Sequence, residues 1–334
     1  MPLEERFSCW KVVEEDYPAE ASLTERLRFL IRYAILAPSS HNTEPWLYRI
    51  HDDQIDLFYD ESRWLKVADS DQRELHISVG CALENLLIAA EHFGLEHQVS
   101  FLPGNDEPSL CANVTFREQE KRAPYRPDEL FSMIPVRHTN HGQCEDREIP
   151  GDLLQQLQDT CVEDSLMLHL TADDEIKQKV DELVVRGDAI EFSDPAFREE
   201  LAQWVGQGVF GTGWLMSKIA KLAVCYIDMG NTQAKKDSEV LMSSPILGLI
   251  SSKTDDRMSQ LQVGQVYERL SLLAALHGIW CQPMSQIVQV PELKSELATL
   301  IPQQGLTPQH PFRIGYAPAE KHHTPRRPFK EVLV

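Results

Sequence analysis

Two segments of this chain repeat one another without a gap. Residues 79–95 align with residues 263–279, and the matched positions share valine, glycine, glutamate, leucine and alanine. Both segments have the apolar periodicity of long, mostly buried helices, and each has a glycine near its end. Leucine and alanine recur by chance on buried helices, so coincidence is the alternative. Two copies predict two related lobes, each with a central helix, fused as a pseudo-dimer.

Composition restricts the partners and the compartment. At 334 residues the chain is long enough for two lobes of ordinary size. The net charge of −20 argues against nucleic acid or an anionic membrane as a partner, because their phosphates would be repelled. The chain has no apolar run of membrane-spanning length, and its N-terminal residues do not resemble a signal peptide, so we expect cytoplasmic residence. Seven scattered cysteines without a CxxC pair fit a reduced compartment.

Strand-like segments favour an α+β sandwich in each lobe. Residues 48–50 and 55–59 flank Asp52 and Asp53, which predicts a hairpin. The further strand candidates are residues 99–102, 110–116, 166–170 and 311–317.

The lobe boundary is expected near a proline-rich stretch. Residues 122–128 have two prolines and charges but little periodicity, which is typical of a linker. We therefore expect lobes at residues 1–125 and 126–334. Glycines and a proline interrupt the segment at about 192–252, which indicates a lid-like insertion rather than core sheet.

A rigid polar turn follows the first amphipathic helix. Ser22 and Glu25 have the spacing of a capping box, and Pro38 is expected to end the helix. Ser39, Ser40 and Asn42 follow, so two hydroxyls and an amide lie on a turn with few accessible conformations. Such a cluster suits a flat heteroaromatic ligand with a hydroxylated chain. The alternative is a turn that only caps the helix.

Two basic elements lie in the second half of the chain. Arg137, His138 and Thr139 combine guanidinium, imidazole and hydroxyl groups that suit a terminal phosphate. Arg326 and Arg327 lie between two prolines and are a second candidate for the same phosphate. In both cases a solvated surface loop is the alternative.

Together these motifs resemble the FMN-dependent nitroreductase superfamily, and more closely its two-lobed, single-chain, Acg-like branch. Residues 38–46 match the family's Pro-Ser-Ser-x-Asn-x-Gln-Pro-Trp element. Residues 137–141 match its phosphate element, residues 270–286 match its central helix and flavin loop, and the closing arginine pair matches as well. The resemblance implies a nitroreductase-like three-layer α/β/α sandwich, internally duplicated.

The resemblance also implies one FMN site per chain, built across the two lobes, with the second pseudo-symmetric site lost. The phosphate ligands it implies are Arg137, His138, Thr139, Arg326 and Arg327. The groups implied for the ribityl chain and ring edge are Ser39, Ser40 and Asn42, and the backbone of Met284 and Ser285 is expected against the isoalloxazine. No catalytic side chain is implied, because the protein of such an enzyme supplies position and electrostatics.

Three departures from the family pattern affect the expected site. Glu44 replaces a glutamine, which adds possible negative charge near the cofactor. His141 stands where a permanent cation is usual, and Ser285 and Gln286 replace a glutamate and a glycine of the flavin loop.

The function implied is hydride transfer from NAD(P)H through flavin to a nitroaromatic or quinone acceptor. The alternative is an FMN-sequestering or storage protein with little reductase activity. We expect a small-molecule substrate and NAD(P)H as partners, and a monomer or weak homodimer, since the pseudo-dimer lies within one chain.

Two further patterns compete with this interpretation. Residues 206–211 fit a dinucleotide-binding glycine pattern, but the residues before them have helical periodicity where that fingerprint needs a strand. His138, His141 and Cys144 have a spacing that suggests zinc, but the same residues fit the phosphate element better.

Overall fold

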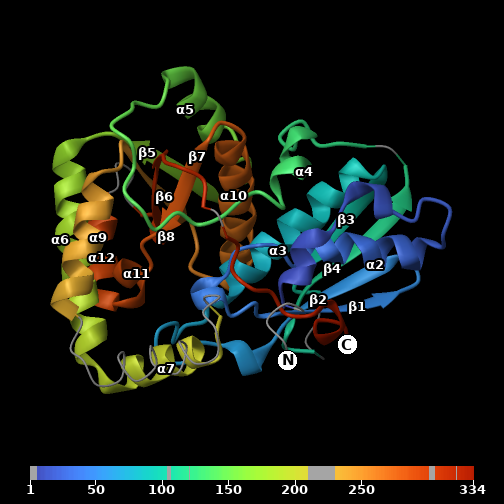
Figure 1. Cartoon of the computed structure of the whole chain (residues 1–334), viewed down its shortest axis with the longest axis horizontal. Coiled ribbons are helices and arrows are strands. Elements are labelled where there is room, and N and C mark those ends of the chain that lie inside the picture. Colours follow the sequence, from blue (N-terminus) through green and yellow to red (C-terminus); the bar gives the residue numbers. More distant parts are fainter. Residues whose placement is uncertain (1–5, 104–106, 120, 210–229, 301–304, 321) are drawn as a thin grey trace.

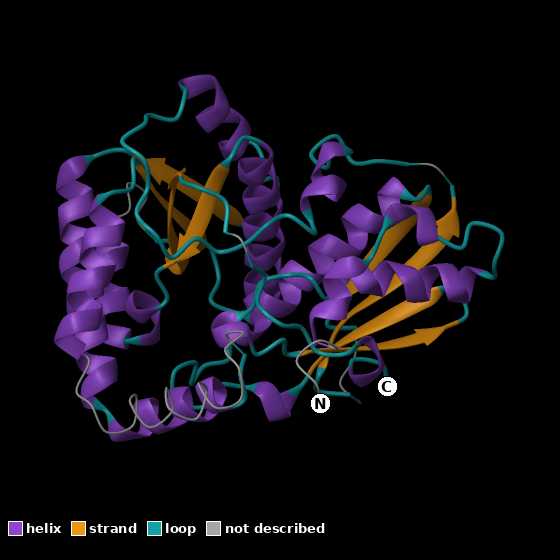
Figure 2. Ribbon diagram, viewed as in Figure 1, coloured by secondary structure: helices purple, strands orange, loops and turns teal. Residues whose placement is uncertain are grey.

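The computed structural model describes residues 6–103, 107–119, 121–209, 230–300, 305–320 and 322–334. The described chain forms two lobes, each with a four-stranded antiparallel sheet (Figure 1, Figure 2). The first sheet has the order β1 (Trp46–His51), β2 (Gln54–Tyr59), β4 (Leu110–Glu118), β3 (Leu95–Phe101). The second has the order β5 (Leu166–Thr171), β6 (Ile246–Ser252), β8 (Thr307–Tyr316), β7 (Ile279–Pro283). Equivalent strands occupy equivalent places, so the α+β class and the internal duplication are confirmed.

Helices pack around these sheets. In the first lobe α2 (Leu23–Ala34) lies beside α3 (Arg73–His92). Ser22 caps the start of this helix, because its hydroxyl accepts a hydrogen bond from the Glu25 N–H. The second lobe contains α10 (Arg257–Leu276), and its outer helices are α5 (Gly151–Gln158), α6 (Asp174–Ser193), α7 (Pro195–Gly206), α9 (Gly230–Met242), α11 (Gln286–Gln289) and α12 (Pro291–Thr299). The short helix α4 (Glu129–Met133) follows the expected linker.

The repeated segments form α3 and α10, which cross at the centre of the molecule (Figure 1). Their glycines, Gly80 and Gly264, meet at the crossing. A Cβ on Gly80 would lie 2.0 Å from the carbonyl oxygen of Leu261, and a Cβ on Gly264 would lie 2.0 Å from that of Ile77. The repeated glycine is therefore required by the close approach of two backbones.

A buried ion cluster joins the same two helices. The Glu84 carboxylate accepts hydrogen bonds from Arg126 Nε at 2.7 Å and from Arg269 Nε at 2.8 Å. The side chains of Glu84 and Arg269 are both fully buried. The two neighbouring guanidinium groups outweigh the cost of burying the carboxylate, and they hold the pKa of Glu84 well below its usual range. The cluster fixes the helices in one relative position.

Replacing Glu84 with glutamine is expected to lower the free energy of unfolding at pH 7 by roughly 3–5 kcal/mol, because two buried guanidinium groups lose their counter-charge. The folded-state pKa of Glu84 is depressed, so its contribution is present above the unfolded pKa of about 4.3 and is lost as the pH falls below it. Urea unfolding should therefore show that the free energies of unfolding of wild type and Glu84→Gln differ less at pH 3 than at pH 7. The exposed Glu199→Gln should match wild type at both pH values, and a pH-independent difference for Glu84→Gln would contradict the assignment.

The last residues of the chain return to the first lobe. The Tyr48 N–H donates to the Val332 carbonyl at 2.7 Å, and the Val334 N–H donates to the Tyr48 carbonyl at 3.0 Å. The Arg326 N–H donates to the carbonyl of Arg6 near the N-terminus at 2.9 Å. This return places the closing arginine pair beside the polar turn of the first lobe.

The prediction of a lid-like insertion at about 192–252 is wrong at its C-terminal end. Residues 246–252 form β6, an inner strand of the second sheet, rather than part of an insertion. These residues form a short apolar run directly after Pro245, and such a run has no alternation that would mark it as a strand. The helices α6, α7 and α9 precede this strand in sequence, and residues 210–229 of the expected lid lie outside the described residues.

Residues 197–205 lie within α7, so a helix precedes the glycine pattern at 206–211, as expected. Within the described ranges, none of the helices is both long enough and apolar enough to cross a membrane.

Candidate functional site

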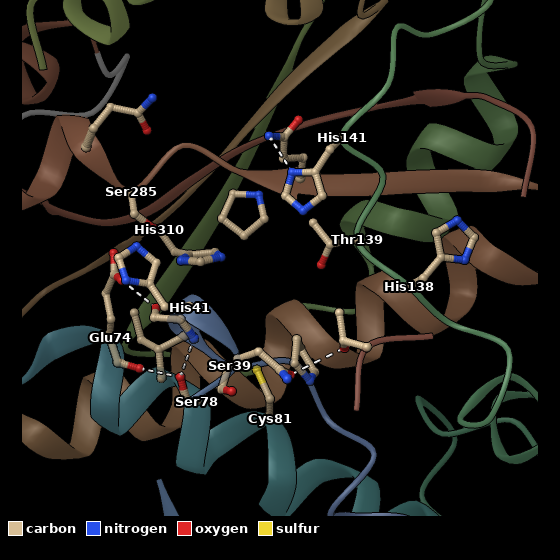
Figure 3. A pocket seen from close by; sticks show the side chains of 18 of the residues that line it. Ser39, His41, Glu74, Ser78, Cys81, His138, Thr139, His141, Ser285 and His310 are labelled. Carbon is tan, nitrogen blue, oxygen red and sulfur yellow. Dashed lines mark hydrogen bonds between the residues drawn. The ribbon is translucent and has the colours of Figure 1, made fainter. Parts of the chain in front are cut away.

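A cavity of about 650 Å³ opens between the two lobes. The first lobe contributes the polar turn at residues 38–42 and one end of α3. The second lobe contributes residues 137–139, the start of α11 and the inner sides of α6 and α9, and the C-terminal return contributes residues 322–324 and Arg326. Figure 3 shows Ser39 and Ser78 of the first lobe across the cavity from Thr139 and His141 of the second.

The polar turn has a strained backbone. His41, Asn42 and Glu44 have φ angles of 48°, 52° and 54°, a left-handed conformation that is costly for residues with side chains. The Ser39 hydroxyl stabilises the turn by accepting a hydrogen bond from the Glu44 N–H at 2.9 Å. The Ser40 hydroxyl donates to the Glu74 carboxylate. Ser39 therefore keeps its hydroxyl proton for a ligand, whereas Ser40 already uses its own.

Arg326 ties the C-terminal return to this turn. Its Nη1 donates to Asn42 Oδ1 at 2.7 Å, and its Nη2 donates to the carbonyls of Leu36 at 3.0 Å and Ala37 at 3.2 Å. The Asn42 amide nitrogen in turn donates to the Val209 carbonyl at 2.8 Å. Both side chains line the cavity, but their polar groups are largely committed to the protein. Burial lowers the pKa of Arg326 to about 10, so it remains a cation at neutral pH.

Arg137 is the cation with unused hydrogen-bonding capacity. It is 4% exposed and lines the cavity, and its Nε lies 3.3 Å from Glu268 Oε1 in an ion pair. Within the described part of the chain, no group accepts a hydrogen bond from its guanidinium. A guanidinium has five N–H donors in a fixed fork. Arg137 is therefore a preformed anion-binding group held from behind by a buried carboxylate.

His138 contributes an uncharged ring to the site. Its Nε2 accepts a hydrogen bond from the Glu320 N–H at 3.0 Å, and its ring packs against that of Trp280, with the ring centroids 3.8 Å apart and the planes tilted by 30°. Burial is the main cause that lowers its pKa, so the ring is neutral at pH 7. His138 and Thr139 both line the cavity, and Thr139 is positioned by a bridge to Cys281 of β7.

Two residues implied by the resemblance do not line the cavity. The Met284 N–H donates to the Pro311 carbonyl at 2.9 Å and its side chain packs in an apolar cluster, so its amide is already used. The Arg327 N–H donates to Glu44 Oε2 at 2.6 Å, and its Nη2 lies 3.1 Å from Asp60 Oδ2. The Glu44 charge is thus compensated inside the first lobe, away from the cavity. Ser285, in contrast, does line it.

One side of the cavity is an acidic wall, which sequence reasoning missed. Its members are Glu74 of α3, Asp188 and Glu191 of α6, and Asp237 of α9. These acids are far apart in sequence and follow no motif. Two of the three elements that carry them lay in or beside the expected lid, so no signal in the sequence brought the four together.

The comparisons with known proteins extend over both lobes. No family model matches the chain. The Mycobacterium tuberculosis protein Rv3131, provisionally named as an NAD(P)H nitroreductase, is 26% identical over 92% of this chain and 90% of its own length. The similarly named protein acg of the same species is 25% identical over 93% of this chain and 96% of its own. The resemblance to the nitroreductase superfamily and its two-lobed Acg-like branch is thereby confirmed.

Solved structures match less of the chain. The FMN-dependent nitroreductase NfnB from Mycobacterium smegmatis, in complex with NADPH, covers 61% of this chain and 96% of its own, with a TM-score of 0.42 and 13% identity. A nitroreductase with bound FMN from Desulfitobacterium hafniense covers 61% and 95%, with a TM-score of 0.40 and 11% identity.

Proposed function

We propose that this protein is an FMN-binding oxidoreductase of the nitroreductase type, which passes a hydride from NAD(P)H through the flavin to a nitroaromatic or quinone acceptor. The observation that carries the proposal is the shared cavity, which is lined both by a cationic fork of the second lobe and by a preorganised hydroxyl turn of the first. The names of the two mycobacterial relatives support the same class of reaction.

The residues present fit a flavin mononucleotide. The cavity volume lies within the range of about 300–1,000 Å³ that is common for ligand pockets. Arg137 supplies a buried cation with free donors for a phosphate, and Thr139, two residues further along the chain, also lines the cavity. Ser39 supplies a hydroxyl for the ribityl chain, and Ile77 and Tyr267 add an apolar surface for a flat ring system.

The protein groups bind and orient in this proposal, and the flavin supplies the hydride chemistry when bound. Arg137 takes the phosphate through its guanidinium fork, with Glu268 fixing the fork from behind. Arg326 adds positive potential and holds the C-terminal return against the turn. Each lobe contributes an essential part, so one chain makes one complete site, and we expect a monomer or weak homodimer.

An absorption spectrum of the purified protein tests the proposal. The flavoenzyme predicts a yellow protein, or one that takes up added FMN, whose flavin absorbance bleaches rapidly when NADH or NADPH is added without oxygen. A yellow protein that neither nucleotide bleaches would instead establish the FMN-sequestering alternative. A colourless protein that takes up no FMN would contradict both.

A further inference from the structure

The acidic wall has carboxylate oxygens without a counter-charge. Glu74 Oε1 and Asp188 Oδ2 are buried atoms with no hydrogen-bond partner among the described residues, and each residue is only 3% exposed. Glu191 Oε1 is a third such atom. Leaving buried charged groups unpaired is costly, so proteins normally pair them.

The partners that the wall does have are neutral. Glu74 accepts from the Ser40 hydroxyl, Asp188 accepts from the Gln286 amide at 3.1 Å, and Asp237 accepts from the Gln233 amide at 2.8 Å. No described lysine or arginine forms an ion pair with any of the four acids, and the described residues hold no cluster suited to a metal ion. Within the described residues these carboxyl groups have no cationic partner, and a bound organic cation would supply one.

Crowding of like charges shows that the acids act as one group. Burial raises the pKa of Glu191 well above its usual range, and Asp188, Glu74 and Asp237 raise it further in that order. Burial and then Asp237 raise the pKa of Asp188 to about 7. A cation placed among them would relieve this repulsion and favour the ionised carboxylates.

The neutral imidazole of His310, which also lines the cavity, is compatible with a cationic ligand. His310 Nε2 is buried and has no partner among the described residues, although the residue lines the cavity and is 5% exposed. Burial lowers the pKa of His310 to about 3, so the ring is uncharged and accommodates a nearby cation without repulsion. Figure 3 shows His310, Glu74 and Ser285 on one side of the cavity, with His138 and Thr139 on the other.

The cavity lining thus contains groups of both signs, the guanidinium groups of Arg137 and Arg326 and the carboxyl groups of the acidic wall. We propose that the acidic wall is a subsite for an organic cation, so that the protein prefers electron acceptors with an ammonium or pyridinium group and disfavours carboxylates. This inference rests on the proposed function only in that the bound cation is taken to be an electron acceptor. The binding preference itself does not require turnover.

Three nitroaromatic probes of similar size test the subsite. They are the cationic (4-nitrobenzyl)trimethylammonium, the neutral 4-nitrobenzyl alcohol and the anionic 4-nitrobenzoate, and their dissociation constants are measured by calorimetry on the protein as purified, without reductant. We expect the cation to bind at least about tenfold more tightly than the anion, with the neutral probe between them. The Asp188→Asn/Asp237→Asn variant should reduce this ratio to about 1–2.

Controls separate the subsite from bulk charge and from misfolding. The exposed Glu182→Gln on the same helix changes the net charge without touching the wall and should leave the ratio unchanged. Thermal melting should show that the double variant is at least as stable as wild type, because it removes repulsion between buried carboxylates.

Equal binding of all three probes, or a cation preference that survives in the double variant, would overturn the inference. Failure of NAD(P)H to bleach the flavin, with the cation preference intact, would instead reject only the proposed function.

Discussion

Alanine at Gly80 or at Gly264 is expected to lower the free energy of unfolding by about 3 kcal/mol or more. The added methyl group would lie 2.0 Å from a backbone carbonyl oxygen of the opposite helix. No rotamer relieves that clash, so α3 and α10 must move apart, and the buried contacts around their crossing must loosen. Urea unfolding followed by circular dichroism measures the loss.

Gly151 provides a matched control. A Cβ at this position meets no atom within 4 Å, and Gly151 begins an exposed helix, so Gly151→Ala should change stability by less than about 1 kcal/mol. The double variant at Gly80 and Gly264 should lose less than the sum of the single variants, because one separation of the helices accommodates both methyl groups. A Gly80→Ala protein as stable as wild type would show that the helices do not cross as described.

Replacing Arg137 with glutamine is expected to weaken FMN binding by roughly 100-fold. A charge-assisted hydrogen bond is worth about 1.5–3 kcal/mol, and a bidentate guanidinium–phosphate contact lies at the upper end of that range. Arg137→Lys keeps the charge but loses the fork, so about a tenfold loss is expected. Quenching of flavin fluorescence on titration measures both affinities.

Riboflavin, which lacks the phosphate, distinguishes a phosphate contact from general damage to the cavity. Its affinity should be nearly equal in wild type and Arg137→Gln, whereas that of FMN should fall. Because Arg137→Gln leaves Glu268 unpaired, the Arg137→Gln/Glu268→Gln protein keeps the buried site neutral and checks that the fold survives. The exposed Arg117→Gln controls for net charge. Equal losses for FMN and riboflavin would contradict a phosphate role for Arg137.

The architecture was largely predictable because its determinants are local or repeated. The periodicity of α3 and α10, the glycine shared by both and the hairpin around Asp52 are all visible in the sequence, and the structure has each of them. The strands β6 and β7 were missed, since a short buried strand has no alternation to distinguish it from a helix fragment or a break.

From the sequence, only those site residues that belong to a recognisable motif were predictable. The structure brings the turn at Ser39 and Ser40 and the arginines Arg137 and Arg326 to one cavity. The resemblance implies Arg327 as part of the closing arginine pair, but neighbouring residues in an extended segment point to opposite sides, and Arg327 contacts Glu44 and Asp60 of the first lobe. The acidic wall depends on tertiary contacts between three helices, which the sequence alone does not reveal.

A crystal structure of the FMN-loaded protein tests the central claim most directly, because the claim concerns which lobes hold the cofactor. We predict one flavin per chain, with its phosphate hydrogen-bonded to Arg137 of the second lobe and its ribityl chain beside Ser39 of the first. A flavin held by one lobe alone, or bound away from this cavity, would contradict it.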